Sequence, residues 1–257
     1  MSVMIKMVAE RDGAWQRVIL DAPPGNLLSL SMVRALNAAL DAVTGLAGVQ
    51  WVTFEGGGGE FSFGAKIQEH APKELPPVLS ETHALFKRLL ALPRPTAALV
   101  SGRCLGGGFE LALACDDILA TESATFGLPE IRLAAFPPAA SVLLPLRVGA
   151  ARATRAIVTG QTQDARYWND AGLLSMVAPQ SNLLDAAGNW FDANLKPHSA
   201  AALSYAALAA RITVRAQAEP ALDLAEKQYL SGLLKTADAA EGVQAWIEKR
   251  APRWKNG

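Results

Sequence analysis

Hydrophobic residues near the start of the chain follow first a strand-like and then a helix-like spacing. Residues 3–9 and 15–21 are short β-like runs, and Asp12-Gly13 between them is a hairpin turn signal. Ser31 can cap a helix further along. The apolar positions that follow it at helical spacing are Val33, Leu36, Leu40 and Val43. The chain is therefore expected to open with a β-hairpin and a crossover helix.

Continuous apolar runs in the middle of the chain predict buried strands. They cover residues 49–54, 97–100 and 118–120. Strands buried on both faces are typical of parallel sheets, so we expect a mostly parallel sheet. Beyond about residue 180 the strand pattern stops, and helical spacing continues over residues 183–195, 200–216, 220–234 and 239–250.

These patterns predict an α/β protein in two parts. Residues 1–180 form the β/α core that holds the active site, and residues 181–257 form a helical C-terminal region. No linker or repeat separates the two parts, so the helical region is expected to pack on the core or on another subunit.

Composition and charge exclude several classes of protein. Apolar residues make up 51% of the chain, which favours a large buried core. The 24 basic residues match the 24 acidic ones, and this balance argues against nucleic acid or an anionic membrane as a partner. Residues 133–146 are the most apolar window, but prolines interrupt it and it is too short to span a bilayer. Cys104 and Cys115 match no metal or redox spacing, so we expect a cytoplasmic protein with reduced thiols.

Two glycine-rich segments, residues 55–65 and 102–110, each follow an apolar strand. Neither segment has the glycine spacing of a dinucleotide fingerprint or the terminal Gly-Lys-Ser/Thr of a phosphate loop. Glycines at the start of a helix over residues 109–115 would let a substrate approach bare backbone N–H groups, as in an oxyanion site. Tight packing of a helix on a sheet explains the glycines equally well, and the residues alone leave both interpretations open.

Three segments together carry a family resemblance. Residues 61–65 (Phe-Ser-Phe-Gly-Ala), 105–111 (Leu-Gly-Gly-Gly-Phe-Glu-Leu) and 126–130 (Phe-Gly-Leu-Pro-Glu) resemble, in order and spacing, the signature segments of the crotonase (enoyl-CoA hydratase/isomerase) superfamily. The similarity continues to residues 241–250. It implies a spiral of ββα turns, a C-terminal helical trimerisation region and an acyl-coenzyme A substrate. It also implies that two backbone amides, by position those of Ala65 and Gly107, hold the thioester carbonyl.

Glu110 and Glu130 are the catalytic candidates. In isolation the first would be an ordinary carboxylate in a helical first turn and the second an ordinary turn residue, but both stand inside the matching segments. Hydration of an enoyl thioester needs one group to deprotonate water and another to deliver a proton to carbon, and two positioned carboxyls can do both. An isomerase can work with one, so the pair favours a hydratase. No metal and no cofactor beyond the coenzyme A thioester is expected.

Two non-enzymatic alternatives come with the same resemblance, because some relatives bind RNA and others keep the fold without activity. The neutral charge and the lack of a basic and aromatic stripe argue against RNA. The intact pair of glutamates argues against an inactive scaffold. A linear enoyl-CoA hydratase or isomerase stays the main alternative within the enzymes.

The resemblance also indicates where coenzyme A binds. The expected contacts come from one loop and from the segment after the first signature: Pro23, Asn26, Phe63, Lys66, Ile67 and Gln68. Lys66 stands where relatives often have Asp, and Gln68 where they often have Lys, so the usual phosphate contact is altered. The candidate replacements, from a neighbouring subunit, are Lys249, Arg250, Arg253 and Lys255. A solvated basic tail is the alternative.

The acyl pocket is expected to involve His70, Phe136, Pro138 and Ala139, although an exposed helical histidine is the commoner interpretation of a residue such as His70. Ordinary enoyl-CoA hydratases have a glycine-rich turn after a single proline here. In this chain Pro137-Pro138 fixes φ at two positions, so the wall should be preformed and suited to a rigid ring. This segment resembles that of the cyclohexa-1,5-diene-1-carbonyl-CoA hydratases of anaerobic benzoyl-CoA degradation.

The helical region carries apolar side chains without a partner strand in their own segment. They are Leu222, Leu224, Tyr229, Leu230 and Leu233. Burial across a subunit boundary would satisfy them. We therefore expect a homotrimer or a dimer of trimers, that is, a hexamer.

Overall fold

The larger of two β-sheets crosses the middle of the molecule. The computed structural model describes residues 4–71 and 74–257. The sheet has the order β1-β2-β3-β4-β6-β9. Its strands are β1 (Ile5–Glu10), β2 (Trp15–Leu20), β3 (Trp51–Gly56), β4 (Thr96–Val100), β6 (Asp117–Thr121) and β9 (Met176–Ala178). β1 and β2 pair antiparallel, and every later neighbour pairs parallel. The predicted hairpin and the predicted parallel sheet are confirmed.

The smaller sheet stands beside the first and carries the signature segments. It has the order β5-β7-β8, with β5 (Arg103–Leu105), β7 (Thr125–Gly127) and β8 (Thr162–Asp164). Isolated parallel bridges join Leu28 to Ala65 and Ser62 to Cys104. The chain therefore returns to the same place after each strand and helix, and it brings residues 62–65 next to residues 104–107.

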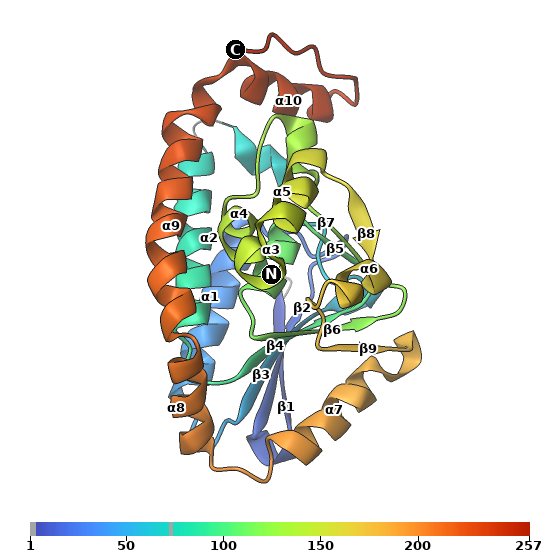
Figure 1. The fold of residues 1–257 in the computed structure, drawn as a ribbon, viewed down its shortest axis with the longest axis vertical. Coiled ribbons are helices and arrows are strands. Elements are labelled where there is room, and N and C mark those ends of the chain that lie inside the picture. The colour runs from blue at the N-terminus through green and yellow to red at the C-terminus, as the bar shows by residue number, and fades with distance from the viewer. Residues whose placement is uncertain (1–3, 72–73) are drawn as a thin grey trace.

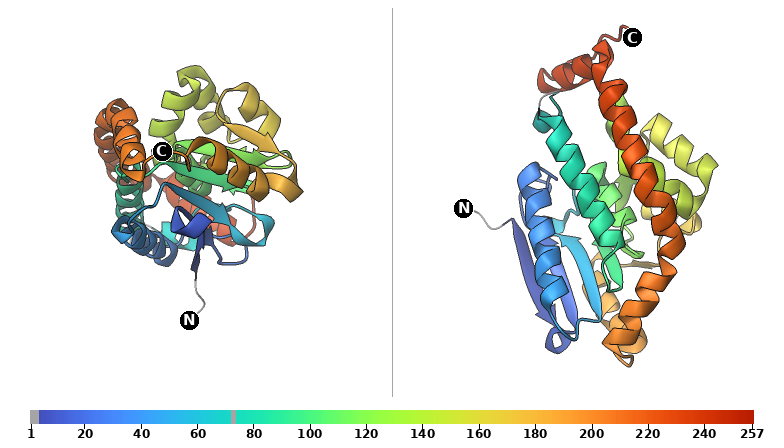
Figure 2. Two further views of the ribbon diagram at one scale, coloured as in Figure 1. Left: turned by 90° about the horizontal axis from the view of Figure 1, so that it is seen from below. Right: turned by 90° about the vertical axis from the view of Figure 1, so that its left-hand side faces the viewer.

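Helices cover both sheets (Figures 1 and 2). The helices of the core are α1 (Leu30–Gly45), α2 (Leu75–Leu90), α3 (Gly107–Leu113), α4 (Pro138–Val148), α5 (Ala150–Thr159) and α6 (Ala165–Asp170). The later helices are α7 (Leu183–Asn194), α8 (Ala200–Ala210), α9 (Ile212–Ser231) and α10 (Ala237–Ile247). Short 3-10 turns are η1 (Arg11–Gly13), η2 (Gly57–Gly59), η3 (Ile67–His70), η4 (Pro129–Leu133), η5 (Gln180–Asn182) and η6 (Leu233–Lys235). In the right-hand view of Figure 2, α1, α2 and α9 lie side by side.

Two local expectations differ from the structure. Ser29, rather than Ser31, caps α1, because its hydroxyl accepts a hydrogen bond from the Met32 N–H. In the C-terminal region a helix break was expected before Pro220, but α9 runs through this residue. The missing hydrogen bond at the proline is offset by burial, since Leu222 packs into the main core. The start of the first expected strand, Val3, lies outside the described residues.

The helical C-terminal region packs on the core of its own chain. Leu222 and Tyr229 are buried, and Leu230 and Leu233 pack beside Tyr229. The expectation that these side chains are buried against another subunit is therefore wrong for Leu222 and Tyr229, which are buried within their own chain. Leu230 and Leu233 are only partly buried. Leu224 is 66% exposed, so for this side chain burial against another subunit stays a prediction. The oligomerisation role of residues 181–257 stays a prediction.

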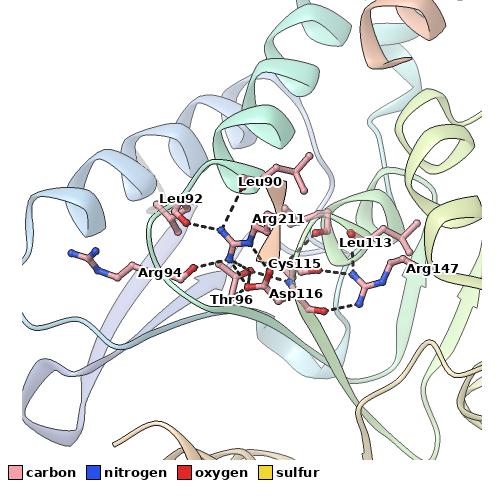
Figure 3. A network of polar contacts seen from close by, with 10 residues as sticks. Leu90, Leu92, Arg94, Thr96, Leu113, Cys115, Asp116, Arg147 and Arg211 are labelled. Atoms are coloured by element: carbon pink, nitrogen blue, oxygen red, sulfur yellow. Dashed lines mark hydrogen bonds and ion pairs between the residues drawn. The ribbon is translucent and has the colours of Figure 1, made fainter. Parts of the chain in front are cut away.

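Arg211, between α8 and α9, fastens this region to the sheet (Figure 3). Its buried guanidinium donates to the carbonyl oxygens of Leu92 at 2.6 Å and Arg94 at 2.7 Å. It also donates to the Asp116 carboxylate, at 2.6 Å for Oδ1. Asp116 in turn accepts from the Thr96 backbone N–H at 2.7 Å. A buried cation is tolerated only when it is paired in this way, so the network sets where α9 begins.

Cys104 and Cys115 are buried and free, as expected. Within residues 4–71 and 74–257, no helix has the length and apolar character needed to cross a membrane.

Candidate active site

A cleft with a volume of about 110 Å³ opens between the start of α3, the turns η3 and η4, and the helices α2, α4 and α9. It contains both predicted catalytic glutamates. Its walls are formed by Leu28, Phe63, Ala65, Ile67, His70, Leu75, Val78, Leu79, Thr82, Gly106, Gly107, Glu110, Pro129, Glu130, Leu133, Phe136, Pro137, Pro138 and Tyr229. Most of these side chains are apolar, so the few polar groups among them are the candidates for chemistry.

Glu110 points into the cleft from the buried helix α3. The residue is only 6% exposed. Its Oε1 accepts a hydrogen bond of 2.9 Å from the Ala140 backbone N–H, and the Ala139 N–H also favours the ionised form. Burial is the larger effect and raises the pKa of Glu110 to about 7. The carboxyl is therefore able to change protonation state near neutral pH.

The helix α3 is held from its far end as well. Arg147 of α4 donates to the carbonyl oxygens of Leu113, at 3.1 Å, and Cys115, at 2.5 Å (Figure 3). These carbonyls follow the last turn of α3, where a cation is favourable. The start of α4 thus fixes the Glu110 carboxylate, and its end fixes the helix that carries Glu110.

Glu130 lies on the short turn η4, which is braced from two sides. Arg132 donates to the Gly160 carbonyl oxygen at 3.1 Å, at the end of α5. On the other side Gly242 of α10 packs so tightly on the Leu133 carbonyl that no larger residue would fit. A helix of the C-terminal region therefore helps to position a residue of the core.

The carboxyl of Glu130 is buried, although the residue as a whole is partly exposed. Its Oε2 is sealed from solvent and has no hydrogen-bond partner among the described residues. Burial, and then the nearby charge of Glu110, raise the pKa of Glu130 to about 8. The pKa of Glu130 is the higher of the two, because the charge of Glu110 adds to the effect of burial and only the backbone N–H of Glu130 itself opposes them, whereas two backbone N–H groups favour ionised Glu110.

We expect the two carboxyls to titrate as a coupled pair, because the charge of Glu110 raises the pKa of Glu130. When one ionises, its charge opposes ionisation of the other. Near neutral pH we expect one carboxylate and one carboxylic acid. Glu110 has the lower pKa and is the carboxylate, and Glu130 has the higher pKa and keeps its proton. An ionised base beside a protonated acid is the arrangement that addition of water requires.

The backbone amides of Ala65 and Gly107 lie together on the same wall. A Cβ placed on Gly107 would stand 3.6 Å from the Ala65 nitrogen and 3.8 Å from Glu110 Oε2. No backbone hydrogen bond found among the described residues uses either N–H. Two unused donors that line a cleft next to an acid/base pair are suited to binding a carbonyl oxygen that becomes negative.

The glycines of the second segment are placed differently from one another, and the structure shows close packing at one of them; the oxyanion site stays a prediction. A Cβ on Gly108 would stand 2.6 Å from the Ser62 Cβ, so this glycine allows close packing of α3 on the neighbouring segment. Gly106 has φ +49° and a Cβ there would stand 2.6 Å from Glu130 Oε1. Gly107 lines the cleft.

The predicted acyl-pocket residues are placed in the cleft with one exception. His70, Phe136 and Pro138 line it. Ala139 does not, because it is fully buried behind Pro138 at the start of α4, and it supports Glu110 through its backbone. Tyr229 is the wall residue that sequence reasoning assigned elsewhere, to a subunit contact. Nothing in the spacing of apolar residues tells whether α9 faces a cleft or a partner.

Most of the residues predicted to contact coenzyme A lie where they can do so, and one does not. Phe63 and Ile67 line the cleft, and Lys66 lies beside them with its ammonium 3.2 Å from Glu69 Oε1. Pro23 is on the exposed loop whose Gly25 packs on the Phe63 ring. These placements are compatible with the prediction.

The prediction that Asn26 contacts coenzyme A does not agree with the position of its side chain. It is buried, and its side-chain amide donates to the carbonyl oxygens of Gly57 at 3.0 Å and Glu60 at 2.9 Å. Its Oδ1 accepts from the Ala22 N–H at 3.0 Å. The side chain ties two loops together and has no surface left for a coenzyme.

The basic C-terminal residues lie closer than expected. Lys249 and Arg250 share a surface hollow with Gln68 of the same chain, so no neighbouring subunit is needed to bring them there. Arg250 is engaged by Glu241 at 2.5 Å and Glu248 at 2.5 Å. Among the described residues, no group of three or more His, Cys, Asp or Glu side chains is placed to hold a metal ion.

Comparison with known proteins agrees with this geometry. The family model described as "Enoyl-CoA hydratase/isomerase" matches residues 11–257. The chain is 37% identical over 252 residues to a cyclohexa-1,5-dienecarbonyl-CoA hydratase of Thauera aromatica, covering 98% of this chain and 97% of that protein. It is 33% identical over 258 residues to the 2,3-dehydroadipyl-CoA hydratase of Escherichia coli K12, covering 98% and 99%. The crystal structure of an enoyl-CoA hydratase from Mycobacterium avium subsp. paratuberculosis superposes with a TM-score of 0.85 at 28% identity, covering 98% and 99%. The predicted fold class is confirmed.

Proposed function

Because the chain belongs to the enoyl-CoA hydratase/isomerase family, whose hydratases are hydro-lyases, we propose that it adds water to a cyclic dienoyl thioester, cyclohexa-1,5-diene-1-carbonyl-CoA. The observation that carries the reaction is the pair of buried carboxyls at unequal pKa in one apolar cleft. The observation that carries the ring is the rigid wall beside them.

Addition of water begins at the Glu110 carboxylate, which takes a proton as the water oxygen attacks the carbon β to the thioester. Negative charge then moves onto the thioester oxygen. The N–H groups of Ala65 and Gly107 stabilise it there, and each such donor is typically worth about 3 kcal/mol. Glu130, which holds its proton at neutral pH, delivers that proton to carbon. Hydration involves no net oxidation or reduction, so it needs no redox cofactor. The two carboxyls supply the acid and the base, so no metal is proposed.

The acyl group lies against a wall that is preformed. Phe136, Pro137 and Pro138 line the cleft directly before and at the start of α4. The Ser141 backbone N–H and hydroxyl both donate to the Pro137 carbonyl oxygen, at 2.9 and 2.8 Å. Two proline rings and this double hydrogen bond leave the wall little freedom to adapt, which suits a flat ring better than a flexible chain. The 37% identity to a dienoyl-CoA hydratase supports the same substrate.

An acyl chain that ends in a carboxylate fits less well. The Escherichia coli relative at 33% identity acts on dehydroadipyl-CoA by its name. Of the described residues that line the cleft, none is a lysine or an arginine. A second carboxylate would therefore be buried without a cationic partner, which is costly. The competing proposal that remains is a linear, uncharged enoyl-CoA.

We predict a higher kcat/KM for the cyclic dienoyl-CoA than for crotonyl-CoA. A hydrophobic pocket that gains or loses one contact discriminates by roughly 10- to 200-fold, so the preference should fall in that range. The measurement is the steady-state rate with each of the two thioesters, monitored through the loss of conjugation on hydration. If crotonyl-CoA is turned over more efficiently under the same conditions, the ring substrate is wrong and the linear enoyl-CoA takes its place.

Coenzyme A is proposed to run from the cleft past Phe63, Lys66 and Ile67 to the hollow formed by Gln68 and Lys249. This route is supported by two placements: Phe63 and Ile67 line the cleft, and Gln68, the next residue along the chain, shares the hollow with Lys249, where η3 contacts α10. It gives the phosphates a lysine from the C-terminal end of the same chain. We place the reaction in the cytoplasm.

We also propose a homotrimer or a dimer of trimers. The support is the helix α8 and the start of α9, where α8 has no buried residue although its sequence is mostly apolar. Tyr205, Ile212 and Leu224 are large, exposed and on these two helices. Light scattering at micromolar concentration should give three or six times the mass of one chain, and a monomer would refute the proposal.

A further inference from the structure

Tyr229 stands on the wall of the cleft opposite the core glutamates. It comes from α9, so it belongs to the C-terminal region rather than to the signature segments. The residue is 6% exposed, and its ring packs on that of Phe136 with 5.1 Å between the centroids. The packing fixes the ring, so the position of the phenol hydroxyl is fixed with it.

The hydroxyl of Tyr229 has no hydrogen bond to any residue that the structure describes. Buried tyrosine hydroxyls usually find a partner, because a polar group without one is costly in an apolar site. The hydroxyl is not sealed from the cleft that Tyr229 lines, so a water or a bound ligand in the cleft can be its partner. Burial, and the nearby charges of Glu130 and Glu110, raise the pKa of Tyr229, so the phenol keeps its proton and remains a donor.

The alternative polar group on the wall, His70, cannot take this part. Its Nδ1 lies 3.3 Å from the Lys66 carbonyl oxygen, and a carbonyl can only accept, so Nδ1 carries the ring proton. Burial lowers the pKa of His70 and keeps the ring neutral. Its Nε2 is then an acceptor only. The hydroxyl of Thr82, which also lines the cleft, already donates to the Val78 carbonyl oxygen at 2.7 Å, so Tyr229 is left as the wall hydroxyl that is free to donate.

We propose that Tyr229 is a positioning residue that hydrogen-bonds the oxygen added in the reaction, first as the water held beside the glutamates and then as the hydroxyl of the product. This rests on the proposed hydration. The water between Glu110 and Glu130 can donate one O–H group to each carboxyl. A hydrogen bond from the Tyr229 hydroxyl to one of its two lone pairs would then leave the other lone pair directed at the substrate carbon. The unsaturated substrate carries no such oxygen, so its own affinity does not depend on Tyr229.

The test is Tyr229→Phe, which keeps the ring on Phe136 and removes the hydroxyl. We expect kcat to fall about tenfold with KM for the unsaturated thioester nearly unchanged, since one hydrogen bond to a reacting group is lost. Tyr167→Phe is the matched control, because Tyr167 packs edge-on against Trp168 at 5.1 Å on α6 and does not line the cleft. It should leave both constants unchanged.

A binding measurement separates this role from a structural one and needs no turnover. In a Glu110→Gln background, which slows the reverse reaction, calorimetry compares the hydroxyacyl-CoA product with the saturated acyl-CoA that lacks the hydroxyl. Adding Tyr229→Phe should weaken binding of the hydroxy compound about tenfold and leave the other unchanged. Equal weakening of both, or of neither, would overturn the role of Tyr229. If the wild-type protein fails to hydrate any enoyl-CoA, hydration fails as a function, and the binding comparison still decides whether Tyr229 holds a hydroxyl.

Discussion

Glu110→Gln and Glu130→Gln should each lower kcat for hydration by about 10²-fold or more, while coenzyme A thioesters still bind. The amide keeps the shape and volume of the carboxyl but cannot take or give the proton. Glu110 already accepts the Ala140 N–H, and an amide oxygen can accept the same bond, so the site should stay assembled. Single-turnover rates and the dissociation constant of an unreactive acyl-CoA give the two quantities separately.

The control for these variants is Glu219→Gln, which changes an exposed carboxylate paired with Arg215 on α9. It should have no effect on the rate. Near wild-type hydration by either catalytic variant would contradict the assignment of two carboxyls. Loss with only one of them would instead indicate an isomerase, since moving a double bond requires one carboxylate.

Gly106→Ala should lower kcat by about 10²-fold through displacement of Glu130. The added Cβ would stand 2.6 Å from Glu130 Oε1, so one of the two must move. Gly106 also has φ +49° and ψ −126°, a conformation that costs a residue with a side chain on the order of 1–3 kcal/mol. Rates of hydration, with circular dichroism to show that the protein is folded, measure the effect.

Gly172→Ala separates backbone strain from the contact with Glu130. Gly172 has φ +73°, and a Cβ there would meet no atom within 4 Å. This variant should lose a little stability and keep its activity. If Gly106→Ala is as active as Gly172→Ala, the carboxyl of Glu130 does not need its observed position.

The sequence predicts the elements well where one local pattern determines them. The hairpin around Asp12-Gly13 and the parallel strands follow from alternation and from continuous apolar runs, and the structure has them. The cap at Ser29 in place of Ser31 is a shift of two residues between equivalent hydroxyls. Pro220 inside α9 shows a local rule overridden by burial, which no window of sequence reveals.

The residues of the candidate site also differ in whether a local sequence pattern reveals them. Glu110, Glu130, Ala65 and Gly107 are found from motifs, because each motif holds its residues within a few positions. Tyr229 is missed because α9 follows the motifs by about 100 residues, and only the tertiary packing brings it to the cleft. Asn26 is misassigned because a polar loop residue looks the same in sequence whether it contacts a ligand or three carbonyl groups of its own chain.

The most direct test of hydration is mass spectrometry of the products formed from a cyclic dienoyl-CoA and from crotonyl-CoA in ¹⁸O-labelled water. We expect a product heavier than the substrate by one labelled water, formed by the wild-type protein and lost in the Glu110→Gln and Glu130→Gln variants. A product of unchanged mass with a shifted double bond, or release of free coenzyme A, would contradict hydration by the two glutamates.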